Sequence, residues 1–111
     1  DIEIAKEQLY KKDRPSDSQI STDSIIKAVS GHYNIPTPDL VSKSRNKDIT
    51  FARHVAMYII RKLLNLTHQE IGFHFGGRDH TSVIHAVTKI DQIMNSDNPL
   101  AKDIHQIEAS F

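Results

Sequence analysis

Apolar residues recur every three or four positions along most of the chain, and this spacing predicts amphipathic helices separated by short polar breaks. The clearest helix spans residues 79–95, with apolar positions at Val83, Ala86, Val87, Ile90, Ile93 and Met94. Other helices are predicted over residues 2–12, about 21–34, about 50–65 and 67–75, and from 97–99 onward. No strand-like alternation is convincing, so we expect an all-α fold.

Capping residues and prolines indicate where several of these helices begin. Ser21 or Thr22 is expected to cap the helix that follows it. Pro38 is expected to open a single helical turn over residues 38–41, since proline is favoured at the first helical position. The polar loop 42–48 comes next and separates this turn from the long helix.

A pair of helices with a glycine break between them follows the long helix. Thr67, with Glu70 three residues later, forms a capping-box pattern at the start of the first helix of this pair. Gly76 and Gly77 end that helix, and the next one begins with polar residues. Two helices joined by a short glycine-containing turn are typical of a helix-turn-helix unit, which places its second helix against DNA.

The apolar faces of the predicted helices identify the expected core. Outside the helix 79–95, the side chains expected to be buried are Ile25, Ile26, Val29, Tyr33, Phe51, Val55, Ile59, Leu63, Leu100, Ile104 and Ile107. Arg53, His54, Arg61 and Lys62 are expected to lie off the buried stripe of the long helix. One core fits a chain of 111 residues, which we divide into an arm and linker, 1–20, and a domain, 21–111.

Composition excludes some classes of protein. The chain has no cysteine, so it forms neither disulfides nor thiolate metal sites. Its longest apolar run, residues 55–60, is far shorter than the ~20 residues of a membrane helix. No basic and then apolar signal segment opens the chain, and its first residue is not methionine. We expect a soluble intracellular domain that is a fragment of a longer protein.

The net charge of zero hides a sorting of charges along the chain. Residues 1–42 hold five basic and seven acidic side chains, residues 43–89 hold eight and three, and residues 90–111 hold one and four. The three net charges are therefore −2, +5 and −3. A basic middle segment indicates an anionic partner bound on one side of the molecule, although a solvated helix face would carry the same charges.

The first residues of the helix 79–95 carry groups that can read DNA bases. A helix N-terminus has free N–H groups and a positive dipole end, which favour a nearby phosphate. The Asp79 carboxylate would suit the exocyclic amine of cytosine, while His80 and Thr81 would meet thymine methyl groups or base edges. The alternative for Asp79 is a purely structural N-cap, bonded to the N–H of Ser82 or its neighbour.

Residues 76–86, GGRDHTSVIHA, resemble the signature of the C-terminal DNA-binding domain of the DnaA family, the bacterial chromosomal replication initiators. The resemblance extends over residues 21–108 and includes Arg45, Arg61 and residues 70–72. Residues 2–7 resemble the connector that joins this domain to an ATPase module. The resemblance implies a helix-turn-helix domain of five to six helices, similar to the Trp repressor, preceded by a connector helix and linker.

The same resemblance implies a function. Domains of this family bind DnaA boxes, short asymmetric duplex elements repeated in replication origins, and so support the initiation of chromosome replication, with transcriptional regulation as a further role. Matched by position, Asp79, His80 and Thr81 would read bases in the major groove. Arg45 would enter an adjacent A·T-rich minor groove, whose negative potential suits arginine.

Contacts to phosphates, which position a domain without reading sequence, are implied for a further set of residues. These are Lys43, Lys47, Arg53, His54, Arg61, His68, Gln69, Arg78, Ser82 and His85. His54 stands where the family usually has glutamine, and His68 and Gln69 replace a small or apolar residue followed by proline. Ser82 replaces threonine, and Asn46 and Asp48 make the loop less basic than is usual.

Seven histidines raise the question of an enzyme or a metal site. His80 and His85 are five residues apart and diverge around a helix, whereas zinc-binding helices place ligands four apart. No glycine-rich phosphate-binding loop with lysine and threonine is present in the sequence. We therefore expect no catalytic residue, no metal and no cofactor in this chain, and ATP only in the full-length protein.

The expected partners are double-stranded DNA and the ATPase domain of the same protein. The expected location is the cytoplasm, at the nucleoid, without contact with a membrane. The alternative is a protein-interaction module, or another helix-turn-helix regulator, that docks partner domains through its end helices. The acidic segment 90–111 and the apolar side of residues 2–12 favour this alternative.

Overall fold

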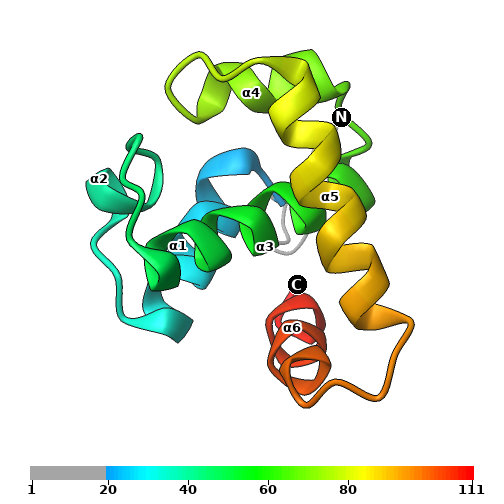
Figure 1. Ribbon diagram of the computed structural model, residues 1–111. Coiled ribbons are helices and arrows are strands. Elements are labelled where there is room, and N and C mark those ends of the chain that lie inside the picture. Colours follow the sequence, from blue (N-terminus) through cyan, green and yellow to red (C-terminus); the bar gives the residue numbers. More distant parts are fainter. Residues whose placement is uncertain (1–19) are drawn as a thin grey trace, which may run out of the picture.

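The structure, a computed structural model, describes residues 20–111, so the predicted connector helix over 2–12 and all but the last residue of the predicted linker over 13–20 lie outside this range. Within the described residues the chain forms six α-helices and no strand, which confirms the all-α prediction (Figure 1). The helices are α1 (Thr22–Tyr33), α2 (Thr37–Leu40), α3 (Lys47–Leu64), α4 (His68–His74), α5 (His80–Met94) and α6 (Leu100–Ala109).

Side-chain caps lie where the sequence predicts two of the helix starts. Ser21 caps α1 in a capping box with Ser24, and Thr67 caps α4 in a capping box with Glu70. At its other end α1 stops at Asn34, whose left-handed φ of 57° turns the chain away from the helix. An N-cap hydrogen bond stabilises a helix by about 1 kcal/mol, so these side chains fix where α1 and α4 begin.

Two helices begin earlier than predicted. α2 starts one residue before Pro38, which is therefore its second residue. α3 starts at Lys47 rather than near residue 50, because the Asn46 side chain accepts hydrogen bonds from the N–H groups of Asp48 and Ile49. The predicted polar loop is thus shorter, and its last two residues lie in the first turn of α3.

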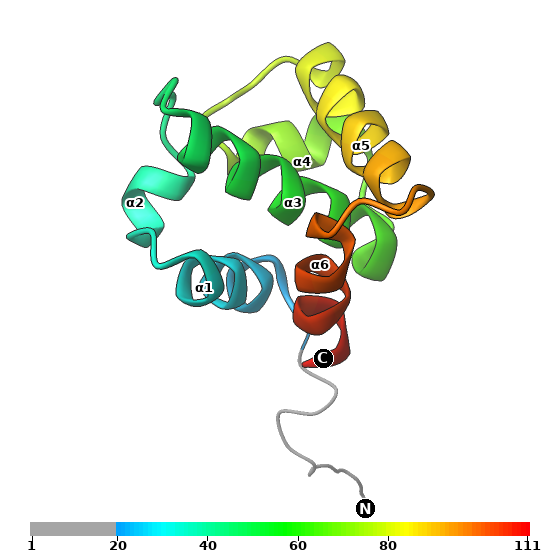
Figure 2. The ribbon, with the colours of Figure 1, turned by 60° about the horizontal axis from the view of Figure 1, so that its bottom comes forward.

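The central helix is α3, which contacts α1, α2, α4 and α5 (Figures 1 and 2). It is buried around most of its circumference, and its buried residues are Ala52, Arg53, Val55, Ala56, Met57, Tyr58, Ile59 and Ile60. The surrounding helices contribute Ile25, Ile26, Val29, Val83, Ala86, Ile90, Ile104 and Ile107 to the same core. Those eight were all expected to be buried, so the apolar periodicity identified the packed faces of α1, α5 and α6.

Two leucines that were expected in the core lie at the surface. Leu63 is 36% exposed and Leu100 is 38% exposed. Each belongs to a terminal turn, where the apolar stripe of α3 or α6 continues past the neighbours that cover the rest of it. Leu64, the last residue of α3, and Leu66, in the segment before α4, instead pack against the core. None of the helices within residues 20–111 is both long and apolar enough to cross a membrane.

Candidate nucleic-acid interface

The turn between α4 and α5 depends on its glycines. Gly76 and Gly77 have φ values of +80° and +73°, in the left-handed region that other residues rarely adopt. The sequence did not distinguish which of the two needs a positive φ, and both do. Phe75, just before them, is fully buried and anchors the turn in the core.

A close approach of two backbones fixes where α5 starts. The Arg78 N–H donates to the Gly72 carbonyl oxygen at 2.9 Å. A Cβ atom at Gly72 would lie only 2.3 Å from the Arg78 carbonyl oxygen, so no other residue fits there without moving the turn. The start of α5 is therefore held directly against α4, as a helix-turn-helix unit requires.

The reading tip, which we define as Asp79, His80 and Thr81, is exposed at the start of α5. Asp79 occupies the N-cap position, but its carboxylate accepts no hydrogen bond from the helix N–H groups. Its Oδ1 atom lies 3.2 Å from His80 Nδ1, and the two side chains are 67% and 59% exposed. The carboxylate is thus available as an acceptor, while Val83 on the opposite face of α5 is buried.

The basic loop, residues 42–46, alternates small polar side chains with basic ones. The polar side chains support the backbone. The Ser42 hydroxyl donates to the Asp39 carbonyl oxygen and accepts from the N–H of Ser44. The Ser44 hydroxyl in turn accepts from the N–H of Asn46. Lys43 and Arg45 lie between them and are exposed. From the sequence, Asn46 was expected only to make the loop less basic. The alternation of small polar and basic residues is the sequence pattern that could have predicted these backbone hydrogen bonds.

Arg53 lies in the core, and its expected position off the buried stripe is wrong. The side chain is only 2% exposed. Its Nε donates to the Leu40 carbonyl oxygen and its Nη2 to the Ser44 carbonyl oxygen, both at 3.0 Å. Since α3 is enclosed on nearly all sides, a long polar side chain can be buried if its donors find acceptors. The phosphate contact predicted for Arg53 remains untested, and this burial argues against it.

A basic hollow lies between the loop, α3 and α5. Lys43, Arg45, His54 and Arg78 line one part of it, together with Ser44, Thr50 and Arg53. Arg45 and His54 also line an adjoining part with Lys47, Thr50, Phe51 and Lys89. The fold thus brings together six residues predicted to contact DNA, while Ser44, Thr50, Phe51 and Lys89 were not among the predicted site residues.

His54 is neutral at pH 7. Burial, with the charges of Lys89, Arg53 and Arg78 nearby, lowers the pKa of its imidazole from 6.5 to about 4. A neutral imidazole still carries one N–H donor, so His54 can donate a hydrogen bond but adds no charge to the hollow.

A second group of predicted contact residues lies where α3 ends and α4 and α5 begin. Arg61 donates from Nη1 to the Leu66 carbonyl oxygen at 2.6 Å and is half-buried. Burial, with the charges of Arg61 and His80 nearby, lowers the pKa of His68. On α5, Ser82 and His85 are exposed beside the reading tip. Figure 2 shows the basic loop, the glycine turn and the start of α5 along one edge of the molecule.

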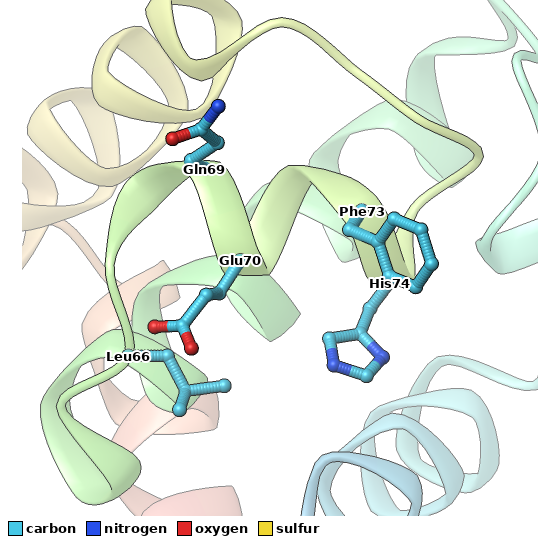
Figure 3. A pocket seen from close by; sticks show the side chains of 5 residues that line it. All are labelled: Leu66, Gln69, Glu70, Phe73 and His74. Atoms are coloured by element: carbon cyan, nitrogen blue, oxygen red, sulfur yellow. The ribbon is translucent and has the colours of Figure 1, made fainter.

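An apolar hollow lies on α4 (Figure 3) and shares no lining residue with the basic hollow. It is lined by Leu66, Gln69, Glu70, Phe73 and His74, and Phe73 is 78% exposed. The hollow includes no lysine or arginine, so its chemistry does not favour a phosphate. Gln69, which was predicted to contact a phosphate, projects from the first turn of α4 on the side away from Leu66 (Figure 3).

Fold and site together define a helix-turn-helix domain in which α4 supports α5 and a basic loop lies beside the start of α5. A family model described as the bacterial DnaA protein helix-turn-helix matches residues 22–90. The chain belongs to this family, as its resemblance predicted.

Known relatives agree with this assignment. The chain is 39% identical over 108 residues to the chromosomal replication initiator protein DnaA of Xanthobacter autotrophicus, covering 96% of this chain and 21% of that protein. It is 41% identical over 110 residues to the protein of the same name from Burkholderia multivorans, covering 99% and 21%. A crystal structure of a DNA replication initiation factor superposes with a TM-score of 0.72 at 29% identity, covering 80% of this chain and 27% of that one. The chain thus spans about a fifth of the length of these curated relatives.

Proposed function

We propose that this domain binds double-stranded DNA sequence-specifically, at DnaA boxes of a bacterial replication origin, and thereby supports the initiation of chromosome replication. The observation that carries the proposal is the reading tip: three exposed polar residues at the start of a helix whose other face is anchored in the core. A helix that enters the major groove needs this division between an anchored face and an exposed start.

The reading tip would supply contacts to base edges in the major groove. The Asp79 carboxylate, free of any cap hydrogen bond, would accept from the amine of cytosine. His80 and Thr81 would contact neighbouring bases. Arg45, exposed on the basic loop, would enter the adjacent minor groove, where a narrow A·T-rich segment concentrates negative potential.

The phosphate contacts would surround these base contacts. Exposed basic and polar side chains suit this role best, and they are Lys43, Lys47, Gln69, Ser82 and His85. His54, His68, Arg61 and Arg78 are partly buried and would contact phosphates through the atoms that remain exposed. The family resemblance also implies ATP binding, an ATPase domain as partner and a nucleoid location, and we propose these only for a full-length protein.

A footprint on origin DNA tests the proposal. We expect the domain to protect discrete boxes, and a His80→Ala variant to lose that protection while it retains weak binding along the whole duplex. Protection spread evenly along the DNA by the wild-type domain would contradict sequence-specific reading and would leave a non-specific DNA-binding module. Absence of any binding would favour the interaction-module alternative.

A further inference from the structure

The basic loop is held from inside the molecule by two arginines. Arg53 donates to the carbonyl oxygens of Leu40 and Ser44, and Arg78 donates from Nη2 to the Ser42 carbonyl oxygen at 3.2 Å. The three acceptors are alternate residues of the chain that leads to Arg45. Because both guanidinium groups bind backbone oxygens, they fix the path of the loop together with the hydrogen bonds of the Ser42 and Ser44 hydroxyls.

The two guanidinium groups lie close together at an electrostatic cost. Burial, with the charge of Arg78 nearby, lowers the pKa of Arg53. Among residues 20–111, neither arginine forms an ion pair with a carboxylate. The loop carbonyls are therefore the acceptors that stabilise these charges, and loop geometry and arginine placement depend on each other.

Arg78 also belongs to the glycine turn. Its backbone N–H is bonded to Gly72, so its main chain is fixed on α4 while its side chain reaches the loop. The turn itself approaches the loop, since a Cβ atom at Gly76 would lie 3.4 Å from the Val41 carbonyl oxygen. The basic loop and the start of α5 are thus directly connected.

We propose that Arg53 and Arg78 are positioning residues that hold Arg45 in register with the reading tip, so that one duplex is contacted in both grooves at once. The inference rests on the proposed function. Arginine is needed at position 53 because two nitrogens of its planar fork, Nε and Nη2, reach two separate carbonyl oxygens. The lysine ammonium is a compact group with a single nitrogen and cannot span both.

The test is an Arg53→Lys variant, which keeps the charge and removes the fork. Wild-type and variant domains are each used to select duplexes from a library with a randomised central segment, and the selected sequences are compared. We expect the variant to lose the base preferences that an Arg45→Ala variant also loses. It should keep the preferences that depend on the reading tip, as identified with a His80→Ala variant.

Coupling between the two residues gives a second readout. We expect Arg53→Lys and Arg45→Ala each to weaken binding to the duplex selected by the wild-type domain on the order of tenfold. If Arg53 acts through Arg45, the double variant is also about tenfold weaker, and not the roughly hundredfold weaker expected of independent contacts. A direct phosphate contact of Arg53 predicts the independent result.

Arg61→Lys is the matched control, since it is the same chemical change at an arginine whose carbonyl partner, Leu66, lies outside the basic loop. It should keep both sets of base preferences. Thermal unfolding shows whether each variant is folded. If Arg53→Lys is not, Arg78→Ala carries the test, because it removes the hydrogen bond to the Ser42 carbonyl oxygen at a side chain that is only partly buried. Uniform weakening with all preferences intact, or independent losses in the double variant, would overturn the inference. A wild-type domain that selects no sequence refutes the proposed function itself, before any variant is compared.

Discussion

At the start of α5, the Asp79 carboxylate makes no hydrogen bond to the helix it precedes, although its position in the sequence is that of an N-cap. Both roles weighed from the sequence, structural cap and base reader, used the same acceptor atoms. The structure leaves those atoms exposed, which favours reading. The sequence alone cannot separate the two roles, because a cap and a base contact require the same residue types at the same place.

The residues proposed to read bases and those proposed to bind phosphates should respond differently to substitution. We expect His80→Ala or Thr81→Ala to cost ~1 to 3 kcal/mol of binding free energy on the cognate box and little on other duplexes. Arg61→Ala should weaken all duplexes alike. Fluorescence anisotropy with a cognate duplex and its single-base variants measures both effects. A change of base preference in Arg61→Ala, with none in His80→Ala, would contradict these roles.

His54 makes folding stability depend on pH. Its pKa is about 4 when folded and 6.5 when unfolded, so the unfolded chain binds the proton more tightly. The free energy of unfolding is therefore highest above about pH 6.5 and falls as the pH drops toward 4. We expect a loss of about 1 to 2 kcal/mol after allowance for solvent screening. Urea unfolding across this range should show a shallower loss for His54→Gln. If the unfolding free energies of wild type and His54→Gln fell in parallel with pH, the proposed contribution of His54 would be ruled out.

At the scale of single helices, the sequence predicted which side chains are buried more accurately for helices with one packed face than for α3, which is enclosed. α1, α5 and α6 contact the core on one side, and their apolar stripes were identified correctly. α3 is covered on nearly all sides, so a stripe pattern could not show that Arg53 is buried. The alternating residues of the basic loop act through local hydrogen bonds to the backbone, which leave no apolar period in the sequence.

The two N-caps of the helix-turn-helix unit should differ in their effect on stability. Thr67→Ala removes a hydrogen bond of 3.1 Å from the Glu70 N–H, and we expect a loss of about 1 kcal/mol. Asp79→Ala removes no such bond, and we expect it to change the free energy of unfolding by less than about 0.5 kcal/mol. Thermal unfolding of both variants measures the difference. Equal losses would show that Asp79 caps α5 after all.

The packing of α4 on α5 should tolerate no side chain at Gly72. Gly72→Ala places a Cβ atom against the Arg78 carbonyl oxygen, so we expect a loss of about 1 to 3 kcal/mol in unfolding free energy. Gly31→Ala is the matched control, because Gly31 lies in α1 with open space around it. That change should be neutral or stabilising, by up to about 1 kcal/mol. Denaturant unfolding compares the two, and similar losses would contradict the close approach.

At the scale of the whole molecule, the sorting of charge along the sequence becomes a sorting in space. The basic segment 43–89 forms nearly all of the basic loop, all of α3 and α4, the glycine turn and most of α5, while the acidic segment 90–111 forms the end of α5 and all of α6. Counting charges along the sequence predicted a basic zone but not its shape, since the hollow joins residues from the basic loop, α3, the glycine turn and α5. An oriented field of this kind steers a polyanion to one side of the domain.

The central claim is that this domain reads a DNA sequence, and an equilibrium titration in rising salt tests it most directly. The domain is titrated onto a DnaA-box duplex and onto the same duplex with its bases scrambled, at several salt concentrations. We expect both affinities to fall steeply with salt as counterions are released, and the box to remain bound at least about a thousandfold more tightly. Equal affinity for the two duplexes at every salt concentration would contradict the account.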